Sequence, residues 1–151
     1  MNSPKLNNIQ NIKAAQAAGR VFLDFFVHTS SISALAPAAS LPDSVNIQAD
    51  SAFILDKIAV FADIAGAAQT AATKVVPLVT IQITDTGSGR QLQQGAMPLP
   101  NIAGNGELPF VLTEPRVFVP NSVIQITYTN FDAAATYNIR LSLIGRKVFQ
   151  L

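Results

Sequence analysis

The only histidine of the sequence, His28, has acidic and hydroxyl side chains close to it. Asp24 lies four residues before it, and Ser30 and Ser31 follow it closely. On a helix, Asp24 and His28 would share one face, and together with a serine they are the residue types of a Ser-His-Asp hydrolase. Such a site also needs its serine on a strained turn, and the G-x-S-x-G motif of that turn does not occur. We therefore predict that His28 is a solvent-facing or hydrogen-bonded residue without a catalytic role.

The carboxylates of the sequence are few and dispersed. Glycoside hydrolysis needs two acids that flank the scissile bond, but both glutamates, Glu107 and Glu114, lie among prolines and glycines. The aspartates other than Asp24 fall near expected strand ends or turns, where a carboxylate accepts hydrogen bonds from the backbone; they are Asp43, Asp50, Asp56, Asp63, Asp85 and Asp132. This placement predicts capping residues and no catalytic pair.

Motifs for cofactors and metal ions are incomplete in the same way. The glycines of residues 87–89 complete neither a dinucleotide nor a P-loop fingerprint, and residues 85–87 lack the further carboxylates of a calcium loop. One histidine and no cysteine cannot supply a usual zinc site. There is no tryptophan to stack on a sugar, and Tyr128 and Tyr137 have the parity of inward-facing residues. We expect no cofactor, no metal ion and no enzymatic activity.

Charged residues are scarce, at 13% of the chain against 49% hydrophobic residues, whereas soluble domains carry about 25% charged residues. A chain of this composition must hide much of its surface or lie beside partners. Its ten basic residues are scattered, with only Arg146 and Lys147 adjacent. The basic stripe of a nucleic-acid-binding protein is therefore missing. We expect permanent assembly with other proteins and no direct contact with nucleic acid.

Neither a membrane nor a secretory route is indicated. No window approaches the roughly 18 apolar residues of a membrane-spanning helix. Residues 1–13 are polar and rich in asparagine, without the apolar run of a signal peptide. The absence of cysteine rules out a disulfide framework. We expect a protein that is made and used without crossing a membrane by the secretory pathway.

Residues 51–151 are predicted to form a single all-β domain, a β-sandwich resembling a jelly roll. Residues 79–84 and 137–143 alternate strictly between apolar and polar side chains, which is typical of strands with one buried face. Residues 53–61 are apolar on both faces, as in a central strand. The alternation changes phase at Gly145, which we interpret as a β-bulge at that glycine. Short strands separated by turn signals favour a sandwich or jelly roll.

Residues 1–50 have a different composition and are predicted to form an extended N-terminal arm. Residues 13–19 favour a short helix that ends at a glycine, and residues 28–49 are rich in serine, alanine and proline. Such an apolar but irregular segment suits an arm that lies along a neighbouring protein. Its expected interface residues are three phenylalanines, Phe22, Phe25 and Phe26. The alternative is that residues 21–27 are the first strand of the sandwich itself.

Four runs in the C-terminal part are similar to small virion proteins of tailed bacteriophages: residues 81–92, 107–112, 115–122 and 137–149. The resemblance covers roughly residues 51–151 and consists of strand and turn signatures without catalytic residues. It implies a capsid-associated protein with a β-sandwich or jelly-roll core. Within that class it resembles a decoration or cement protein that binds the major capsid protein.

We therefore expect a structural virion protein that binds and stabilises the shell of the major capsid protein. It would be a homo-oligomer on the capsid surface, made in the cytoplasm of the host, and bound to the major capsid protein or other virion proteins. An apolar arm suits this role because it buries further area at every copy around the shell. Two alternatives stay open: a head–tail connector, tail or fibre component, and a carbohydrate-binding module.

Overall fold

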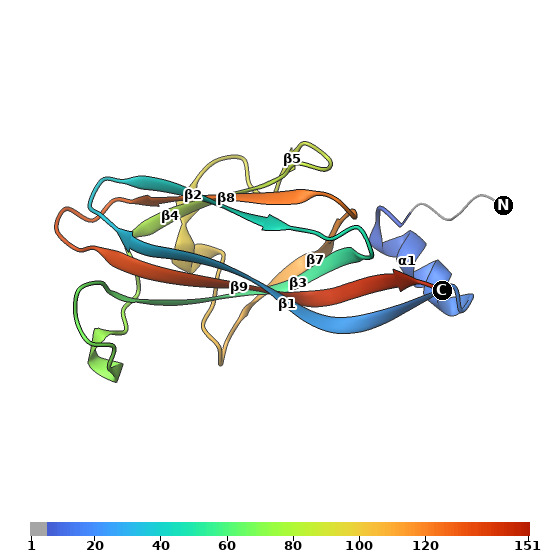
Figure 1. Cartoon of the computed structure of the whole chain (residues 1–151), viewed down its shortest axis with the longest axis horizontal. Helices are drawn as coiled ribbons and strands as arrows, with labels where there is room; N and C mark the ends of the chain where they lie inside the picture. Colours follow the sequence, from blue (N-terminus) through green and yellow to red (C-terminus); the bar gives the residue numbers. More distant parts are fainter. Residues whose placement is uncertain (1–5) are drawn as a thin grey trace.

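Nearly all regular structure in the computed structural model, which describes residues 6–151, is β-strand. One helix, α1 (Ile9–Ala17), comes first, and two 3-10 turns, η1 (Ala71–Thr73) and η2 (Leu99–Asn101), lie in loops. The strands run lengthwise in two layers (Figure 1). In chain order they are β1 (Val21–Leu35), β2 (Ser40–Asn46), β3 (Ala52–Ile64), β4 (Val79–Asp85), β5 (Arg90–Gln91), β6 (Met97–Pro98), β7 (Phe110–Phe118), β8 (Val123–Asn130) and β9 (Tyr137–Gln150).

The strands form two antiparallel sheets with a jelly-roll connectivity. The first sheet has the order β1-β9-β3-β7, and the second has the order β2-β8-β4-β5 with β6 beside β4. Leaving β6 aside, β1 pairs with β9, β2 with β8, β3 with β7 and β4 with β5, so the pairs are nested around the β4–β5 hairpin. A long hairpin rolled over two sheets in this way is a jelly roll. The predicted all-β sandwich is thus confirmed.

The core lies between the two sheets and follows the alternation of the sequence. Every second residue of β4 and of the first half of β9 is fully buried, as predicted. The same holds for Ile124, Ile126 and Tyr128 on β8. Phe53 and Phe118 fill the end of the core that is nearer to α1, and both are fully buried.

The predicted arm of residues 1–50 is corrected by the structure, because most of it belongs to the sandwich. β1 pairs with β9 from Val21 to Leu35, and β2 pairs with β8 from Ser40 to Asn46. The sandwich therefore begins at Val21 and not at residue 51, in agreement with the alternative of a first strand. The proline-rich composition is compatible with this placement because β2 is an edge strand, where a missing backbone donor is tolerated.

The helix predicted over residues 13–19 is present, but it begins four residues earlier and ends two residues earlier, at Ile9–Ala17. The Asn8 side chain caps its start by accepting a hydrogen bond from the Asn11 backbone at 2.9 Å. It ends before Gly19, which adopts a φ of 68° that favours glycine. The helix buries its apolar face on the outer face of the first sheet, the face turned away from the second sheet, against residues that include Ala52, Ile54, Val117 and Val148.

The bulge expected at Gly145 is wrong in its position. The register of β9 with β1 is continuous through Gly145, which pairs with Phe26. The extra residue lies on β3 instead: Leu55 pairs with Gly145 and Lys57 pairs with Ile144, so Asp56 has no opposite residue. The apparent change of phase in the sequence has another cause, since α1 covers the outer face of the sheet at Val148.

Candidate functional site

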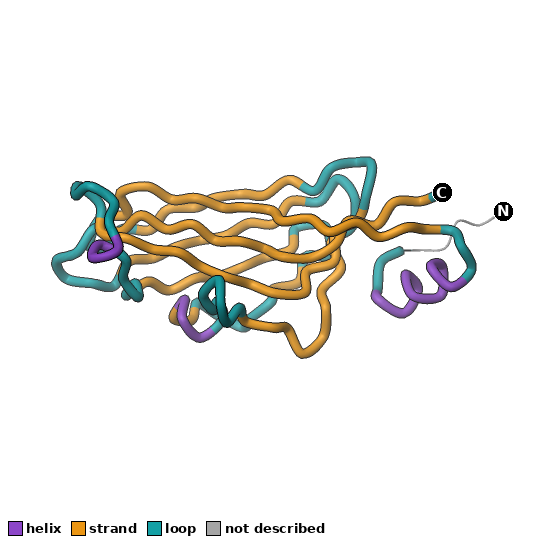
Figure 2. Tube along the Cα trace, turned by 90° about the horizontal axis from the view of Figure 1, so that it is seen from below, coloured by secondary structure: helices purple, strands orange, loops and turns teal. Residues whose placement is uncertain are grey.

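The first half of β1 and the second half of β9 extend past the second sheet (Figures 1 and 2). We call these two paired segments, residues 21–28 and 143–150, the ribbon; β3 pairs with the other side of β9 along residues 143–148. On the inner face of the ribbon, which is the face on the side of the second sheet, the side chains of β1 become less exposed from Phe22 towards Ser30. The side chain of Phe22 is 48% exposed and that of Phe26 is 36% exposed, whereas Ser30 is only 1% exposed. The cover of the second sheet therefore begins near residue 28.

Aromatic rings line the inner face of the ribbon. Phe22 stacks on Phe149, its direct cross-strand neighbour, with 4.9 Å between ring centroids. Further along β1, the edge of Phe26 meets the His28 ring at 4.8 Å. His28 in turn lies 4.6 Å from Phe53 in the core. Phe26 is thus connected to the buried core through His28, whereas Phe22 is held by its stacking on Phe149.

Two opposite charges accompany these rings. The ammonium group of Lys147 lies 4.1 Å from the centroid of the Phe26 ring, within the range of a cation–π contact. Asp24 is exposed, and it is the cross-strand neighbour of Lys147. Burial, and then the charge of Lys147, lower the pKa of His28 below its usual value. The imidazole is therefore neutral at pH 7.

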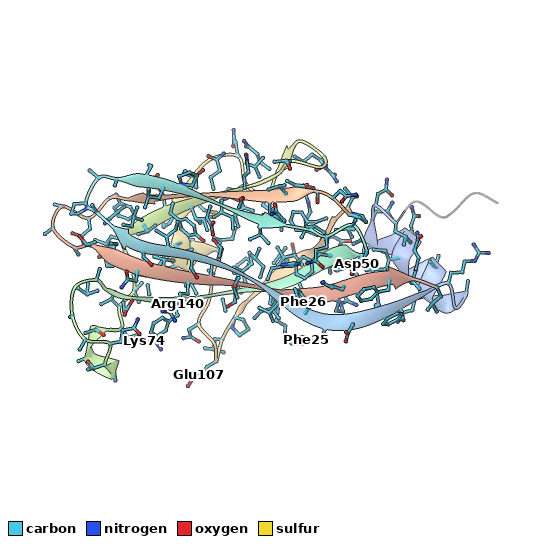
Figure 3. All side chains as sticks on the ribbon, in the orientation of Figure 1. Phe25, Phe26, Asp50, Lys74, Glu107 and Arg140 are labelled. Atoms are coloured by element: carbon cyan, nitrogen blue, oxygen red, sulfur yellow. The ribbon has the colours of Figure 1, made fainter. Side chains whose placement is uncertain are left out.

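Phe25 lies on the opposite, outer face of the ribbon and is the most exposed of the three predicted interface residues, at 70%. Its neighbours two positions away on the same face, Leu23 and Val27, are half-buried. Figure 3 shows Phe25 and Phe26 together where β1 leaves the sandwich. The structure thus brings Phe22, Phe25 and Phe26 to one ribbon but divides them between its two faces.

The catalytic arrangement considered for His28 does not form. Asp24 and His28 are four residues apart on a strand, which separates them by about 13 Å. The ring of His28 is half-buried between Phe26 and Phe53, and its Nε2 has no hydrogen-bond partner among residues 6–151. The hydrogen bond expected for this histidine is therefore missing at Nε2, because the ring packs as an aromatic side chain between Phe26 and Phe53.

A buried polar cluster that the sequence did not reveal lies where the ribbon enters the sandwich. Ser30 of β1 donates a hydrogen bond to Asp43 Oδ2 of β2 at 2.5 Å. Its Oγ is also 2.8 Å from the hydroxyl of Tyr128 on β8. Burial raises the pKa of Tyr128 far above its usual value, so the phenol keeps its proton. The cluster ties β1 to two strands of the second sheet and fixes the root of the ribbon.

The other residues considered for chemistry have structural roles. Asp85 accepts hydrogen bonds from the Gly87 backbone at 2.9 Å and from Ser88 at 2.7 Å. The Tyr137 hydroxyl donates to Asp132 at 2.6 Å, which lowers the pKa of this carboxyl together with bonds from two backbone amides. Asp56, the bulged residue, forms a bidentate ion pair with Arg146, with both N–O distances at 2.9 Å.

These contacts confirm the predicted capping role of Asp85 and Asp132. Tyr128 and Tyr137 are both buried, as their parity predicted. Within residues 6–151, no cluster of three or more histidine or acidic side chains is placed to bind a metal ion. No helix in this range has the length and apolar character needed to cross a membrane.

A second apolar surface lies beside the second half of β3, where β7 no longer pairs with this strand. A groove of about 430 Å³ runs there between residues 74–77 and 100–108. Val76 and Leu108 on its two rims are 75% and 78% exposed. Figure 3 shows Lys74 and Glu107 on the two loops that flank it. The lining is mainly apolar and has no convergent polar groups for a specific small ligand.

Comparisons with known proteins assign no family. No protein-family model matches the sequence, and no curated protein matches it. Among solved structures, the chain is similar to VP2 of the infectious bursal disease virus subviral particle, with 11% sequence identity and a TM-score of 0.26. The match covers 87% of this chain and 36% of the VP2 chain. A likeness at this level transfers no function, and the proposal below depends on the chain's own residues.

Proposed function

We propose that this chain is a structural virion protein that binds the shell of a major capsid protein as a decoration or cement protein. The observation that carries the proposal is the ribbon, which presents Phe22 and Phe26 on one face and Phe25 on the other, outside the sandwich. Exposed aromatic side chains in such a concentration are typical of protein–protein interfaces. The partner is therefore another protein surface, and the chain acts as a scaffold without chemistry of its own.

The ribbon is suited to binding because it is already ordered. The rings of Phe22 and Phe149 are stacked, and Phe26 rests on His28. An interface that is fixed before binding loses little conformational entropy when the complex forms. Complete burial of one phenylalanine side chain contributes about 1.5–3 kcal/mol. Contacts of this size become effective in a cement protein, because they are repeated at every copy around the shell.

Two further observations support a capsid protein over the other classes. The sequence resembles small virion proteins of tailed bacteriophages, and the strand order is that of a jelly roll, a fold that many capsid proteins share. Lectins and cupins share it as well, so this support is an analogy at the level of the fold. Against a sugar-binding role, the two tyrosines are buried, and the exposed phenylalanine rings cannot hydrogen-bond to hydroxyl groups.

Co-sedimentation with empty shells of a tailed-bacteriophage major capsid protein from the same virus as this chain tests the proposal. We expect the full chain to sediment with the shells and the double variant Phe22→Ser/Phe26→Ser to stay in the supernatant. Phe131→Ser is the matched control, because Phe131 is 51% exposed and lies outside the ribbon. Equal sedimentation of the ribbon variant and the control would refute the role of the ribbon.

Labelling of intact particles with an antibody against the chain separates the remaining possibilities. Label distributed over the shell supports a decoration or cement protein. Label restricted to the tail or to the portal vertex contradicts it and indicates a connector, tail or fibre component instead.

A further inference from the structure

The outer edge of β1 is open. β1 is the last strand of the first sheet, and among residues 6–151 no strand pairs with its other side. The Leu151 amide donates to the Arg20 carbonyl at 2.9 Å, so even-numbered residues of β1 exchange hydrogen bonds with β9. Odd-numbered residues therefore direct their backbone N–H and C=O groups outward. In the ribbon these residues include Leu23, Phe25 and Val27.

Most of the usual protections of an edge strand are missing here, and Asp24 is the one charged side chain of residues 21–27. Proteins prevent edge-to-edge pairing with lysine, proline or bulges on the edge, or by covering it. Residues 21–29 contain neither lysine nor proline, and their register with β9 has no bulge. The second sheet ends before the ribbon, so it leaves this part of the edge uncovered (Figures 1 and 2). A partner strand can therefore reach the backbone of β1 directly.

We propose that two copies of this chain pair through β1, antiparallel and about a twofold axis at Phe25. The odd-numbered residues of both copies must face each other to exchange hydrogen bonds. Centred on Phe25, this register places Phe25 opposite Phe25 of the second copy and Leu23 opposite its Val27. The two first sheets then join into one continuous sheet of eight strands, twice the four of each copy.

The side chains of β1 are complementary to themselves in this register. On the outer face, the central pair is aromatic and the flanking pairs are apolar, which are favourable cross-strand combinations. On the inner face, Asp24 lies opposite Phe26 of the second copy. The Phe26 ring carries the Lys147 ammonium at 4.1 Å, so each copy brings a carboxylate next to an ammonium of the other. The twofold axis makes the Leu23–Val27 pair and the contact between Asp24 and Lys147 occur twice, whereas the Phe25 pair lies on the axis and occurs once.

Neighbouring registers lack this match. Shifting the axis to Val27 places Phe25 opposite Thr29 and Asp24 opposite the buried Ser30. Shifting it to Leu23 places Phe25 opposite Val21, which is already buried under α1. The self-complementarity at Phe25 argues for a second copy as the occupant of the edge, rather than a strand of another protein.

The dimer deepens the proposed function without depending on it. Pairing at the edge leaves the inner faces of both ribbons on the same side of the joined sheet. The stacked Phe22 and Phe149 rings of the two copies then form one larger apolar face for the capsid shell. Self-association is measured on the isolated protein, so its failure and the failure of shell binding are separate results.

Sedimentation equilibrium of the full chain tests the dimer. We expect a mass of about 32 kDa, twice the 16.0 kDa of one copy. Phe25→Lys places two ammonium groups opposite each other, and we expect it to raise the dimer dissociation constant at least tenfold. Phe131→Lys, at a site 51% exposed outside the ribbon, is the control. A wild-type monomer at all concentrations, or a dimer that Phe25→Lys leaves intact, overturns the proposal.

The register is tested by cross-linking, because the chain contains no cysteine. A hydrogen-bonded antiparallel pair has its Cα atoms about 5.5 Å apart, within the range of a disulfide. We expect Phe25→Cys to form a covalent dimer on mild oxidation, and Leu23→Cys to cross-link with Val27→Cys but not with itself. Cross-linking of Phe25→Cys no faster than that of Phe131→Cys overturns the register, and circular dichroism confirms that each variant is folded.

Discussion

Gly145 of β9 lies so close to Ile54 of β3 that a Cβ atom at residue 145 would overlap the Ile54 carbonyl oxygen. The bulge at Asp56 is next to this contact, because Leu55 and Lys57 pair with consecutive residues of β9. The bidentate ion pair between Asp56 and Arg146 lies beside it on the outer face. The glycine is therefore required by the neighbouring strand and not by a bulge of its own.

Gly145→Ala should accordingly be among the most damaging conservative substitutions of the chain. The added methyl group has to displace backbone in the centre of the first sheet, and overpacking of this kind costs about 1–3 kcal/mol or more. Urea denaturation followed by circular dichroism measures the change in the free energy of unfolding. Gly95→Ala is the matched control, since a Cβ at Gly95 would meet no atom within 4 Å. Equal stability of the two variants would contradict the close approach.

Much of the sandwich could be predicted because its core strands alternate strictly. Val79, Ile81 and Ile83 are buried on one side of β4, and the polar residues between them face outward, so local sequence is sufficient there. The first half of β1 was predicted only as an alternative, and its second half and β2 were missed, because edge strands need less apolar sequence. The buried inner residue Ser30 is polar, and its burial depends on Asp43, which is distant in sequence.

The candidate site was predicted in its residues but not in its geometry. Three phenylalanines in five residues indicated an interface, yet only their place in a strand puts Phe25 on the opposite face from Phe22 and Phe26. Phe149, which stacks on Phe22, comes from the other end of the chain. Such long-range neighbours leave no local pattern that a single sequence could reveal.

Ser30 should be important for stability although it is a small polar residue. Its single proton goes to Asp43, so Tyr128 donates to Ser30, and all three groups are satisfied together. Ser30→Ala leaves the buried Tyr128 hydroxyl without this acceptor, which we expect to lower the free energy of unfolding by about 1–3 kcal/mol. Ser33→Ala on the same strand is exposed and should change it by less than about 0.5 kcal/mol. Thermal denaturation of both variants decides whether the cluster holds β1.

His28 should make the stability depend on pH in the mildly acidic range. Burial and Lys147 lower its pKa in the folded protein below the usual value of 6.5. The unfolded chain therefore takes up a proton at a higher pH than the folded chain does, so stability is complete above about pH 6.5 and is lost as pH falls through the lowered pKa. We expect the urea midpoint to decrease from pH 7.5 to pH 5.5.

His28→Phe should flatten this dependence. The variant keeps an aromatic ring between Phe26 and Phe53 but removes the titrating group and the buried Nε2 that lacks a partner. Because His28 is the only histidine, no other side chain of this chain has an ordinary pKa in that interval. The same slope in the variant and the wild type would assign the pH dependence to another group.

The two faces of the ribbon should separate self-association from shell binding. Phe25 lies on the outer face at the proposed twofold axis, whereas Phe22 and Phe26 lie on the inner face. Phe22→Ser, which leaves Phe26 and the Lys147 ammonium over its ring in place, should therefore remain a dimer in sedimentation equilibrium and still bind the shell more weakly. Phe25→Lys should become a monomer that keeps the inner face. Each molecule should therefore bind the shell through one ribbon, whereas a dimer binds through two linked ribbons.

The expected loss of shell affinity in Phe25→Lys follows from multivalency. A dimer that holds the shell by two linked contacts can bind 10²–10⁴-fold more tightly than one contact does. Phe25→Lys should thus weaken apparent shell affinity within about that range while the number of sites at saturation stays the same, which surface plasmon resonance on immobilised shells can measure. If Phe25→Lys is monomeric but binds the shell as tightly as the wild type, the two copies do not engage the shell together. If it abolishes sites at saturation, Phe25 itself contacts the shell, and the outer face belongs to that interface.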